Sequence, residues 1–338
     1  MNNENPGRKP TFGESLIVLA LVICLILIGV TVLGVDPHLP MFMALIVCVI
    51  FSMYLKYPWS WIEKNINDGI FMGLLPMLIM VLIGMVIGSW IACGTVPYII
   101  YLGIKIISPR WFLVTTLIAC SIMSFSTGSS WTTAGTIGVA CMGIGYGLGI
   151  PPAMTAGAVM SGAYFGDKQS PLSETTNFAP AVAGTTLFEH VQSMLYSTTP
   201  ALILSAILFT FLGFRYGSGT IDAGNIDLIA NTLQNNFYFS PVLLLPPIIL
   251  ITIIIKKVPA MLGMGIAAIL GLVFAIVFQG VELTSIFSYM HYGYVGKTGV
   301  EAVDALISKG GLNSMMWTIS LMFLSLPMGT LLEKTGVL

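Results

Sequence analysis

The sequence has very little charge for its length. Of its 338 residues, 13 are Lys or Arg and 14 are Asp or Glu, which is 8% of the chain, whereas 56% of the residues are apolar. A soluble domain is about 25% charged, and a chain with so few charges could not cover a globular surface. The apolar content also excludes an intrinsically disordered chain. The net charge of −1 gives no reason to expect nucleic acid as a partner.

Histidine and cysteine are also scarce, with three and five copies. The cysteines lie in apolar segments without metal-ligand spacing, so we expect them to be packing residues. No His-Glu-x-x-His pattern and no Ser/His pair lies in an apolar segment, and we therefore expect neither an enzyme nor a cofactor. We expect His38 to be a solvated loop residue. The cysteines are Cys24, Cys48, Cys93, Cys120 and Cys141.

Long uncharged runs take up most of the chain. A helix needs about 20 mostly apolar residues to cross the hydrocarbon core of a bilayer, so most runs match single spans. The runs 69–104 and 111–166 are too long for one straight helix each and must fold back. We therefore predict an all-α, polytopic membrane bundle that has the lipid bilayer as a partner. The runs are 15–35, 37–55, 69–104, 111–166, 190–214, 228–255, 258–281 and 310–332.

Basic residues beside the first run predict the orientation. Arg8 and Lys9 precede this run, which places the N-terminal tail in the cytoplasm by the positive-inside rule. No small-x-small cleavage site follows before Asp36, so we expect a retained span rather than a cleaved signal peptide.

Two stretches of the chain contain the same order of segments. Residues 15–51 and 240–278 each read as an apolar span, a short turn and a second apolar span, and each leads through a more polar segment to a Met-rich span. Positive charges orient the two opening spans in opposite directions, as in transporters built from inverted repeats. The alternative is a chance resemblance between apolar spans. The predicted segments are a tail at 1–14, a first repeat at 15–215, a polar linker at 216–237 and an incomplete second repeat at 238–338.

The second copy stops at Leu338, just after its Met-rich span. A complete copy would continue through a segment that matches 95–215. We therefore expect the chain to be incomplete at its C-terminal end by roughly 100 residues or more. We also expect a polypeptide that ends at Leu338 to be inactive by itself, because the polar half of the first repeat would lack its counterpart.

Hydroxyl side chains are concentrated at residues 121–136, within an uncharged run. Polar groups are costly inside a membrane and are therefore candidates for function. Gly128 and Gly135 permit a break, so we predict a re-entrant hairpin or broken helix whose ends and free carbonyls bind ions. The alternative is that Ser, Thr and Gly only allow helices to pack closely. The predicted hairpin residues are Ser124, Ser126, Thr127, Ser129, Ser130 and Thr132.

A second polar cluster occupies residues 167–177, between apolar flanks. Gly166 and Pro171 interrupt any helix, so we expect one helix to end near Gly166 and another to start near Ser173. The unwound piece and its side chains offer hard oxygen ligands, which suit a small cation. The alternative is a solvated loop. The predicted cation- and proton-binding residues are Asp167, Ser170, Ser173, Glu174, Thr175, Thr176 and Asn177.

The two carboxyl groups of this cluster indicate coupled exchange. Burial raises the pKa of a carboxyl group towards neutrality. Such a group at Asp167 or Glu174 would release a proton when a cation binds and take it back when the cation leaves. Lys168, the neighbour of Asp167, is the expected charge partner, as a counter-ion or a gate.

The segment 162–184 reads Gly-Ala-Tyr-Phe-Gly-Asp-Lys-Gln-Ser-Pro-Leu-Ser-Glu-Thr-Thr-Asn-Phe-Ala-Pro-Ala-Val-Ala-Gly. It closely resembles the signature of the NhaC-type Na+/H+ antiporters. Residues 299–312 and 315–320 are also similar to that family, and the likeness runs through essentially the whole chain. The acidic position after Leu-Ser in that signature is often Asp, whereas here it is Glu174, which keeps the charge and extends its reach.

The resemblance implies a secondary active transporter of the bacterial inner membrane, built from inverted repeats with helical hairpins, that exchanges Na+ for H+. It implies Na+ bound at Asp167 and Glu174 and no cofactor besides the transported ions. An oligomer, if one forms, is expected to be a homodimer. The family also includes members that exchange Na+ and lactate for protons and malate. That alternative stays open, as does, in last place, a passive cation channel.

Overall fold

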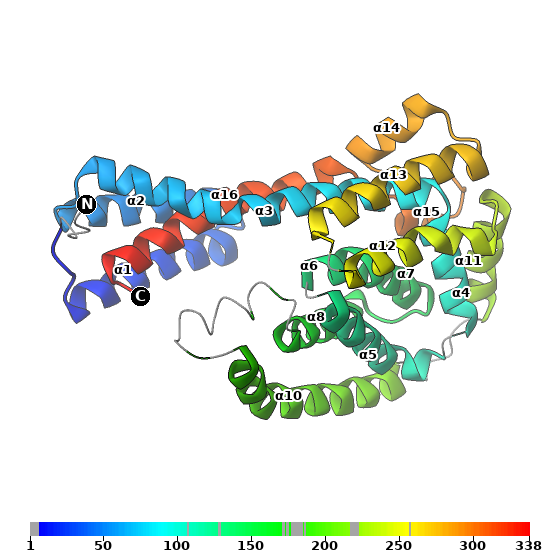
Figure 1. The fold of residues 1–338 in the computed structure, drawn as a ribbon, viewed down its shortest axis with the longest axis horizontal. Coiled ribbons are helices and arrows are strands. Elements are labelled where there is room, and N and C mark those ends of the chain that lie inside the picture. The colour runs from blue at the N-terminus through cyan, green and yellow to red at the C-terminus, as the bar shows by residue number, and fades with distance from the viewer. Residues whose placement is uncertain are drawn as a thin grey trace. The chain divides into compact units, whose positions relative to one another are not determined.

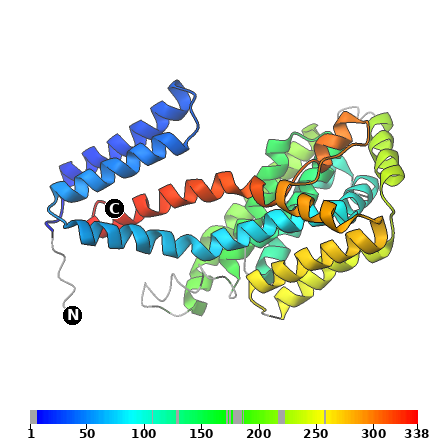
Figure 2. The ribbon, with the colours of Figure 1, turned by 90° about the horizontal axis from the view of Figure 1, so that it is seen from above.

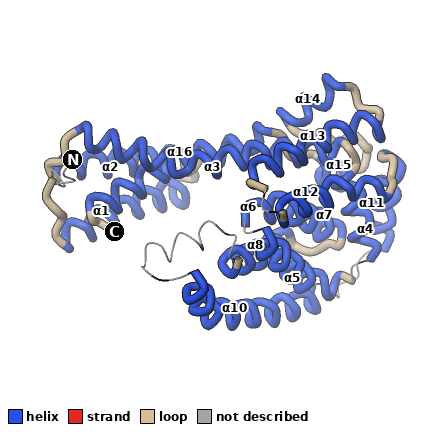
Figure 3. The backbone as a smooth tube through the Cα atoms, viewed as in Figure 1, coloured by secondary structure: helices blue, strands red, loops and turns tan. Residues whose placement is uncertain are grey.

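A computed structural model describes residues 7–106, 108–127, 130–170, 173, 176, 185, 187–216, 223–256 and 258–338 (Figure 1). Helices dominate these residues and none of them forms a strand, as Figure 3 shows, which confirms the predicted all-α class. The chain divides into two compact units, Met1–Met80 with Met315–Leu338 and Val81–Ser314.

Among the described residues, five helices are long and apolar enough to cross a membrane. Many of their large apolar side chains face outwards; Ile17 and Leu204, for example, are 68% and 67% exposed. Such surfaces suit lipid and not water, so the chain is a multi-pass helical membrane protein. The five spans are Phe12–Val32, Trp59–Ala92, Glu189–Tyr216, Met261–Gln279 and Leu312–Thr335, and three shorter apolar helices are His38–Tyr54, Pro109–Phe125 and Pro241–Leu250.

The first unit consists of a helical hairpin and parts of two long helices. Its buried core joins Val18 of the first hairpin helix and Ala44 of the second to Leu331 near the C-terminal end. A Cβ atom at Gly69 would lie 2.9 Å from the backbone of Pro327, so the absence of a side chain there lets the two long helices approach closely. The elements are α1 (Phe12–Leu27), the π-helical η1 (Ile28–Val32), α2 (His38–Tyr54), α3 (Trp59–Ala92) and α16 (Leu312–Thr335).

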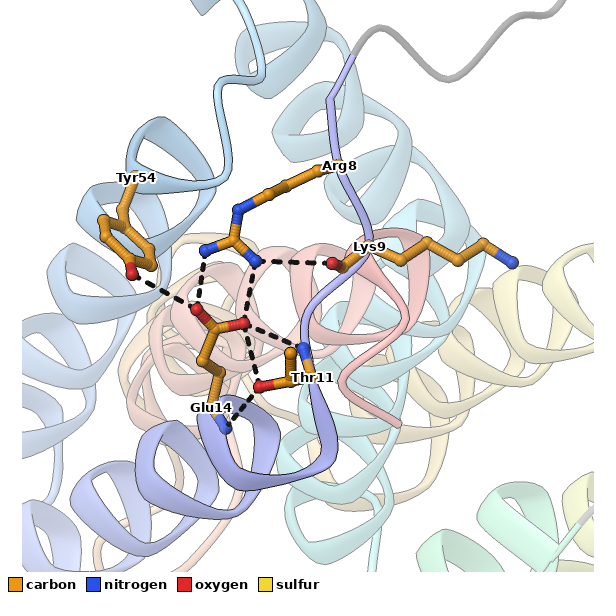
Figure 4. Close-up of polar contacts among 5 residues, drawn as sticks. All are labelled: Arg8, Lys9, Thr11, Glu14 and Tyr54. Atoms are coloured by element: carbon orange, nitrogen blue, oxygen red, sulfur yellow. Dashed lines mark hydrogen bonds and ion pairs between the residues drawn. The ribbon is translucent and has the colours of Figure 1, made fainter.

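A polar cluster fixes the start of α1 (Figure 4). Thr11 is the N-cap residue: its Oγ1 accepts a hydrogen bond from the Glu14 N–H at 3.4 Å, and the Glu14 carboxylate accepts one from the Thr11 N–H at 2.8 Å. This capping box satisfies two backbone donors of the first turn. The Arg8 guanidinium donates to both oxygens of Glu14 at 2.6 and 2.8 Å, and the Tyr54 hydroxyl donates at 3.2 Å. Glu14 therefore ties the segment before α1 to the end of α2.

Replacement of Thr11 by Ala is expected to lower the free energy of unfolding by about 1 kcal/mol, because the N-cap hydroxyl is lost. Unfolding of the purified protein in mixed micelles with increasing SDS, followed by helical circular dichroism, measures the change. Thr31→Ala is a matched control, because the Thr31 hydroxyl donates to the carbonyl of Leu27 within the same helical segment. We expect less than about 0.5 kcal/mol there. Equal losses in the two variants would contradict the capping role.

A second polar cluster joins the loop after η1 to α16. The Asp36 carboxylate contacts His38 Nδ1 and accepts a hydrogen bond from the indole N–H of Trp317 at 2.8 Å. His38 Nε2 lies 2.8 Å from Ser320 Oγ. The hydrogen bond from Trp317, followed by those from His38, lowers the pKa of Asp36 to about 2, because these donors stabilise the ionised form. His38 is thus the first residue of α2 and not the loop residue that was predicted, and it contacts α16 while its side chain stays 25% exposed.

The second unit contains the other helices. In it, α5 makes extensive contact with α8, and α10 packs against both (Figure 1). α12 and α13 form a helical hairpin, as α1 and α2 do in the first unit (Figure 2). The elements are α4 (Thr95–Ile106), α5 (Pro109–Thr127), α6 (Ser130–Thr133), η2 (Ala134–Gly138), α7 (Val139–Gly147), α8 (Pro152–Gln169), α10 (Leu187–Tyr216), α11 (Ala223–Asn236), η3 (Pro241–Leu244), α12 (Leu245–Ile255), α13 (Ala260–Gln279), α14 (Leu283–Tyr292) and α15 (Glu301–Ile307).

Hydrogen bonds join the α12–α13 hairpin to the end of α3. The indole N–H of Trp90 donates to the carbonyl of Ala267 at 3.0 Å. The amide Nε2 of Gln279 donates to the carbonyls of Cys93 at 3.1 Å and Tyr238 at 2.9 Å. Because Trp90 and Cys93 are buried, these bonds satisfy polar groups that apolar surroundings could not.

Candidate cation-binding site

Glycines of α8 allow its backbone to lie directly against α5. A Cβ atom at Gly166 would lie 2.5 Å from the backbone N of Phe125 and closer still to the carbonyl oxygen of Ser121. Gly162, one turn earlier, is equally close to α5. The hydroxyl of Ser124 on α5 donates to the carbonyl of Ala163 on α8 at 2.5 Å. Small residues and an interhelical hydrogen bond are the usual means by which membrane helices associate.

Asp167 follows the last of these glycines and is held inside the second unit. It is 6% exposed. Its Oδ2 accepts a hydrogen bond from the Ser130 hydroxyl of α6 at 3.4 Å, and the same oxygen lies 4.0 Å from Lys168 Nζ. The Lys168 side chain is 36% exposed, so its ammonium group reaches a wetter environment than the carboxylate does. The structure thus brings a predicted hairpin residue, Ser130, to the predicted carboxylate, Asp167.

The end of α8 differs from the prediction. The helix runs to Gln169 and not to Gly166, because Gly166 serves the contact with α5. Ser170 then turns to extended backbone, with φ −77° and ψ 125°, as expected for a residue that precedes a proline. The helix therefore ends three residues after Gly166, directly before the Ser170-Pro171 sequence.

Hydroxyl groups gather at this helix end. Thr176 Oγ1 donates to the carbonyls of Asp167 at 3.0 Å and Lys168 at 3.4 Å, and the Asp167 carbonyl also accepts a hydrogen bond from the backbone N–H of Ser170 at 3.3 Å. Ser170, Ser173 and Thr176 are all buried. A helix C-terminus carries partial negative charge, so the carboxylate, the carbonyls and the hydroxyls together form an oxygen-rich environment that favours a cation.

Part of the predicted site lies outside the described residues. This part contains Glu174, Thr175, Asn177 and Ser129 and the side chains of Ser126, Thr127 and Thr132. The role of these residues in ion binding stays a prediction. So does the re-entrant hairpin, because the two residues between α5 and α6 are not described.

The chain from Ser130 to Gly147 is helical but irregular. It passes through the π-helical η2 before α7, and π-helical turns are common at functional sites. A Cβ atom at Gly135 would lie 2.7 Å from Ile83 Cγ2, and one at Gly138 would lie 2.7 Å from Val159 Cγ1. Gly135 therefore lets its π-helical turn pack closely against Ile83. Close packing, rather than a break in the helix, was the alternative explanation for the glycines of this segment.

The candidate site uses oxygen rather than sulfur or nitrogen. All five cysteines are free thiols, and four of them are buried. In the part of the chain that the structure describes, no three His, Cys, Asp or Glu side chains come together. One buried polar residue is absent from the predicted set: Gln169, the last residue of α8, is 4% exposed, and its amide Nε2 donates to Thr198 Oγ1 of α10 at 2.5 Å. Its place directly before the Ser-Pro break is the sequence signal that could have identified it.

Helices long and apolar enough to span a membrane, together with a buried carboxylate, hydroxyl groups and a helix end, indicate a multi-pass membrane transporter. More particularly, the chain belongs to the Na+/H+ antiporter family, which residues 162–338 match. That range contains Asp167, the end of α8 and both helices of the second hairpin.

Curated relatives of the chain are antiporters. The Na+/H+ antiporter NhaC of Alkalihalophilus pseudofirmus is 39% identical over 98% of this chain and 71% of its own. The malate-2H+/Na+-lactate antiporter of Bacillus subtilis is 40% identical over 98% of this chain and 71% of its own. The arginine/ornithine antiporter ArcD of Halobacterium salinarum is 36% identical over 99% of this chain and 70% of its own. No solved structure matches the chain.

Proposed function

We propose that the protein is a secondary active antiporter that exchanges Na+ for H+ across the bacterial inner membrane, with its N-terminus in the cytoplasm. The observation that carries the proposal is the Asp167 carboxylate, 6% exposed and hydrogen-bonded to the Ser130 hydroxyl of a separate helix. A buried carboxylate in a membrane transporter is costly unless it binds an ion or a proton. Family membership supports the same reading.

Competition for one carboxylate explains the coupling. When Asp167 is ionised, its oxygens and the Ser130 hydroxyl bind Na+, and when Asp167 is protonated the negative charge that holds Na+ is gone. Each Na+ that enters the site therefore displaces a proton, and the reverse step takes place on the opposite side of the membrane. When Asp167 is ionised and no Na+ is bound, the ammonium group of Lys168 offsets part of the negative charge of the carboxylate. Glu174 is the proposed second carboxylate. The ions are the substrates, no bond of a substrate is broken, and we expect no prosthetic group.

Alternating access is proposed to use the inverted repeats 15–215 and 238–338, which move relative to one another about the site. Two features support the repeat. Each begins with a helical hairpin, α1–α2 or α12–α13. Each later enters a long helix, α3 directly after the first hairpin and α16 after α14 and α15 in the second. A glycine in left-handed conformation follows each long helix, Gly94 with φ 83° and Gly336 with φ 84°.

Carboxylate-coupled exchange is the second candidate. Lys168, with a partly exposed ammonium group beside Asp167, offers a positive charge to an organic anion, and one relative is named as a malate/lactate antiporter. In this case Na+ would move with lactate, in exchange for malate and protons.

The two candidates separate in one assay. Everted membrane vesicles are prepared from cells that make the protein from its complete gene, and respiration acidifies their interior. For Na+/H+ exchange we expect NaCl alone to raise the internal pH, with choline chloride as the inactive control. For the second candidate the pH change requires malate inside and lactate outside. Na+ entry without any linked proton movement would contradict both candidates and indicate a channel.

A further inference from the structure

Both ring nitrogens of His38 face hydrogen-bond acceptors. Nδ1 contacts the carboxylate of Asp36, which has no proton to donate when it is ionised. Nε2 lies 3.0 Å from the backbone carbonyl oxygen of Trp317 and 2.8 Å from Ser320 Oγ, both on α16. The Ser320 hydroxyl donates its proton to the same carbonyl at 2.9 Å, so it can only accept from His38. A neutral imidazole donates through one nitrogen alone, and the protonated ring is therefore the form that satisfies both sides.

The charges near His38 favour the protonated ring as well. Asp36, in the loop before α2, is the titratable group that faces the ring, and its pKa of about 2 keeps it ionised at neutral pH. The uncharged runs that contain η1 and α2 carry no other charge. On α16 the Trp317 indole contacts the ring, with the two ring centroids 5.1 Å apart, and the charged residues Glu333 and Lys334 lie at the other end of the helix. The hydrogen bond to Asp36 therefore raises the pKa of His38.

We propose that His38 is a regulatory proton-binding site, separate from the transport site, whose protonated ring joins α2 to α16 on the outer side of the membrane and slows the exchange; the proposal rests on the proposed function. α2 belongs to the first repeat and α16 to the second, and alternating access moves the repeats relative to one another. A polar contact that joins them resists this movement. With the N-terminus in the cytoplasm, the span Phe12–Val32 places His38 on the outer side.

The contact depends on pH in one direction. Because the pKa of His38 is raised in the folded protein, the contact is fully formed below the ordinary histidine pKa of about 6.5. It is lost as the pH rises through the raised pKa. Acid outside the cell therefore slows the exchange, and alkali removes this inhibition.

NMR of the purified protein in micelles, labelled with 15N-histidine, tests the proton site without any transport. The chain has three histidines, and the signal that His38→Gln removes belongs to His38. We expect His38 to titrate at higher pH than His291, an exposed histidine whose ring contacts that of Tyr292. In Asp36→Asn the titration of His38 should move to lower pH, because the negative charge is lost. Titration of wild-type His38 at or below the pH of His291 would overturn the proposal.

Exchange of 22Na+ for Na+ in proteoliposomes, with equal pH on both sides, tests the regulation. Protonation of the transport site affects all variants alike, so the ratio of the His38→Gln rate to the wild-type rate isolates His38. Below about pH 6 we expect this ratio to be about two to five, the range for a partly exposed charged contact. It should fall to one as His38 loses its proton in the NMR titration. For the control His291→Gln we expect a ratio of one at every pH.

Each outcome decides a separate point. A ratio of one throughout the titration would overturn the regulatory role and leave the proposed function intact. A ratio above one that does not change with pH would also overturn it, in favour of a contact that is independent of the proton. Absence of Na+ exchange from the wild type would overturn the proposed function and the regulation with it, whereas the histidine titration does not depend on transport.

Asp36→Asn keeps the proposal testable if His38→Gln does not fold. This variant keeps the imidazole and moves its titration to lower pH. If the protonated ring slows the exchange, the pH range in which exchange is slow must move down together with the titration. A pH profile of exchange that matches the wild type, while the titration of His38 has moved, would overturn the proposal.

Discussion

Replacement of Asp167 by Asn is expected to abolish Na+-driven pH change in vesicles while leaving the protein in the membrane. Asn has nearly the same size and still accepts the hydrogen bond from Ser130, which is 3.4 Å away. It carries no charge and binds no proton at neutral pH. A charged hydrogen-bonded contact contributes about 1.5–3 kcal/mol, so we expect Na+ to bind at least about tenfold more weakly. The proton half of the exchange is lost altogether.

Two further substitutions serve as controls for this result. Asp68→Asn removes an exposed carboxylate of α3 and is expected to leave exchange within about twofold of the wild type, because exposed charges in water contribute little. Asp167→Glu restores the charge one methylene further out, and we expect weak but measurable exchange. Full activity of Asp167→Asn, with normal amounts of protein in the membrane, would refute the assignment of this carboxylate.

The spans were predictable because the bilayer imposes a length on them. The uncharged run 258–281 contains α13, and the run 69–104 divides at Gly94 into α3 and α4, as its excess length required. A hydrocarbon core of fixed thickness limits every crossing helix. The ends of helices outside the core are not limited in this way. Accordingly α3 begins at Trp59 and includes charged residues that the uncharged run leaves out.

The candidate site was predictable in its residue types and less so in its geometry. A carboxylate and clustered hydroxyls between apolar flanks indicated ion binding, and the structure does bring Asp167 and Ser130 together. The function of Gly166 was not predictable, because glycine breaks helices and also permits close packing. Only the position of α5 decides between the two.

The contact between α5 and α8 yields the second large expected effect. In Gly166→Ala the new methyl group would lie 2.5 Å from the backbone N of Phe125 and 2.7 Å from the Cβ atom of Ser124. Neither atom can rotate away, so the two helices must separate. Overpacking of this kind costs about 1–3 kcal/mol, and we expect the free energy of unfolding in SDS to fall by that amount. Exchange should fall as well, because Asp167 is the next residue and moves with the helix.

Gly157→Ala, in the same helix, is the matched control. A Cβ atom there would lie 3.5 Å from the ring of Phe209, which is an ordinary van der Waals distance. Alanine favours a helix by up to about 1 kcal/mol over glycine, so this variant should be as stable as the wild type or more so. The same glycine-to-alanine change is thus expected to lower the free energy of unfolding at Gly166 and to maintain or raise it at Gly157, because different atoms face the two positions. Equal stability of the two variants would mean that the close approach at Gly166 does not hold α8, and with it Asp167, in place.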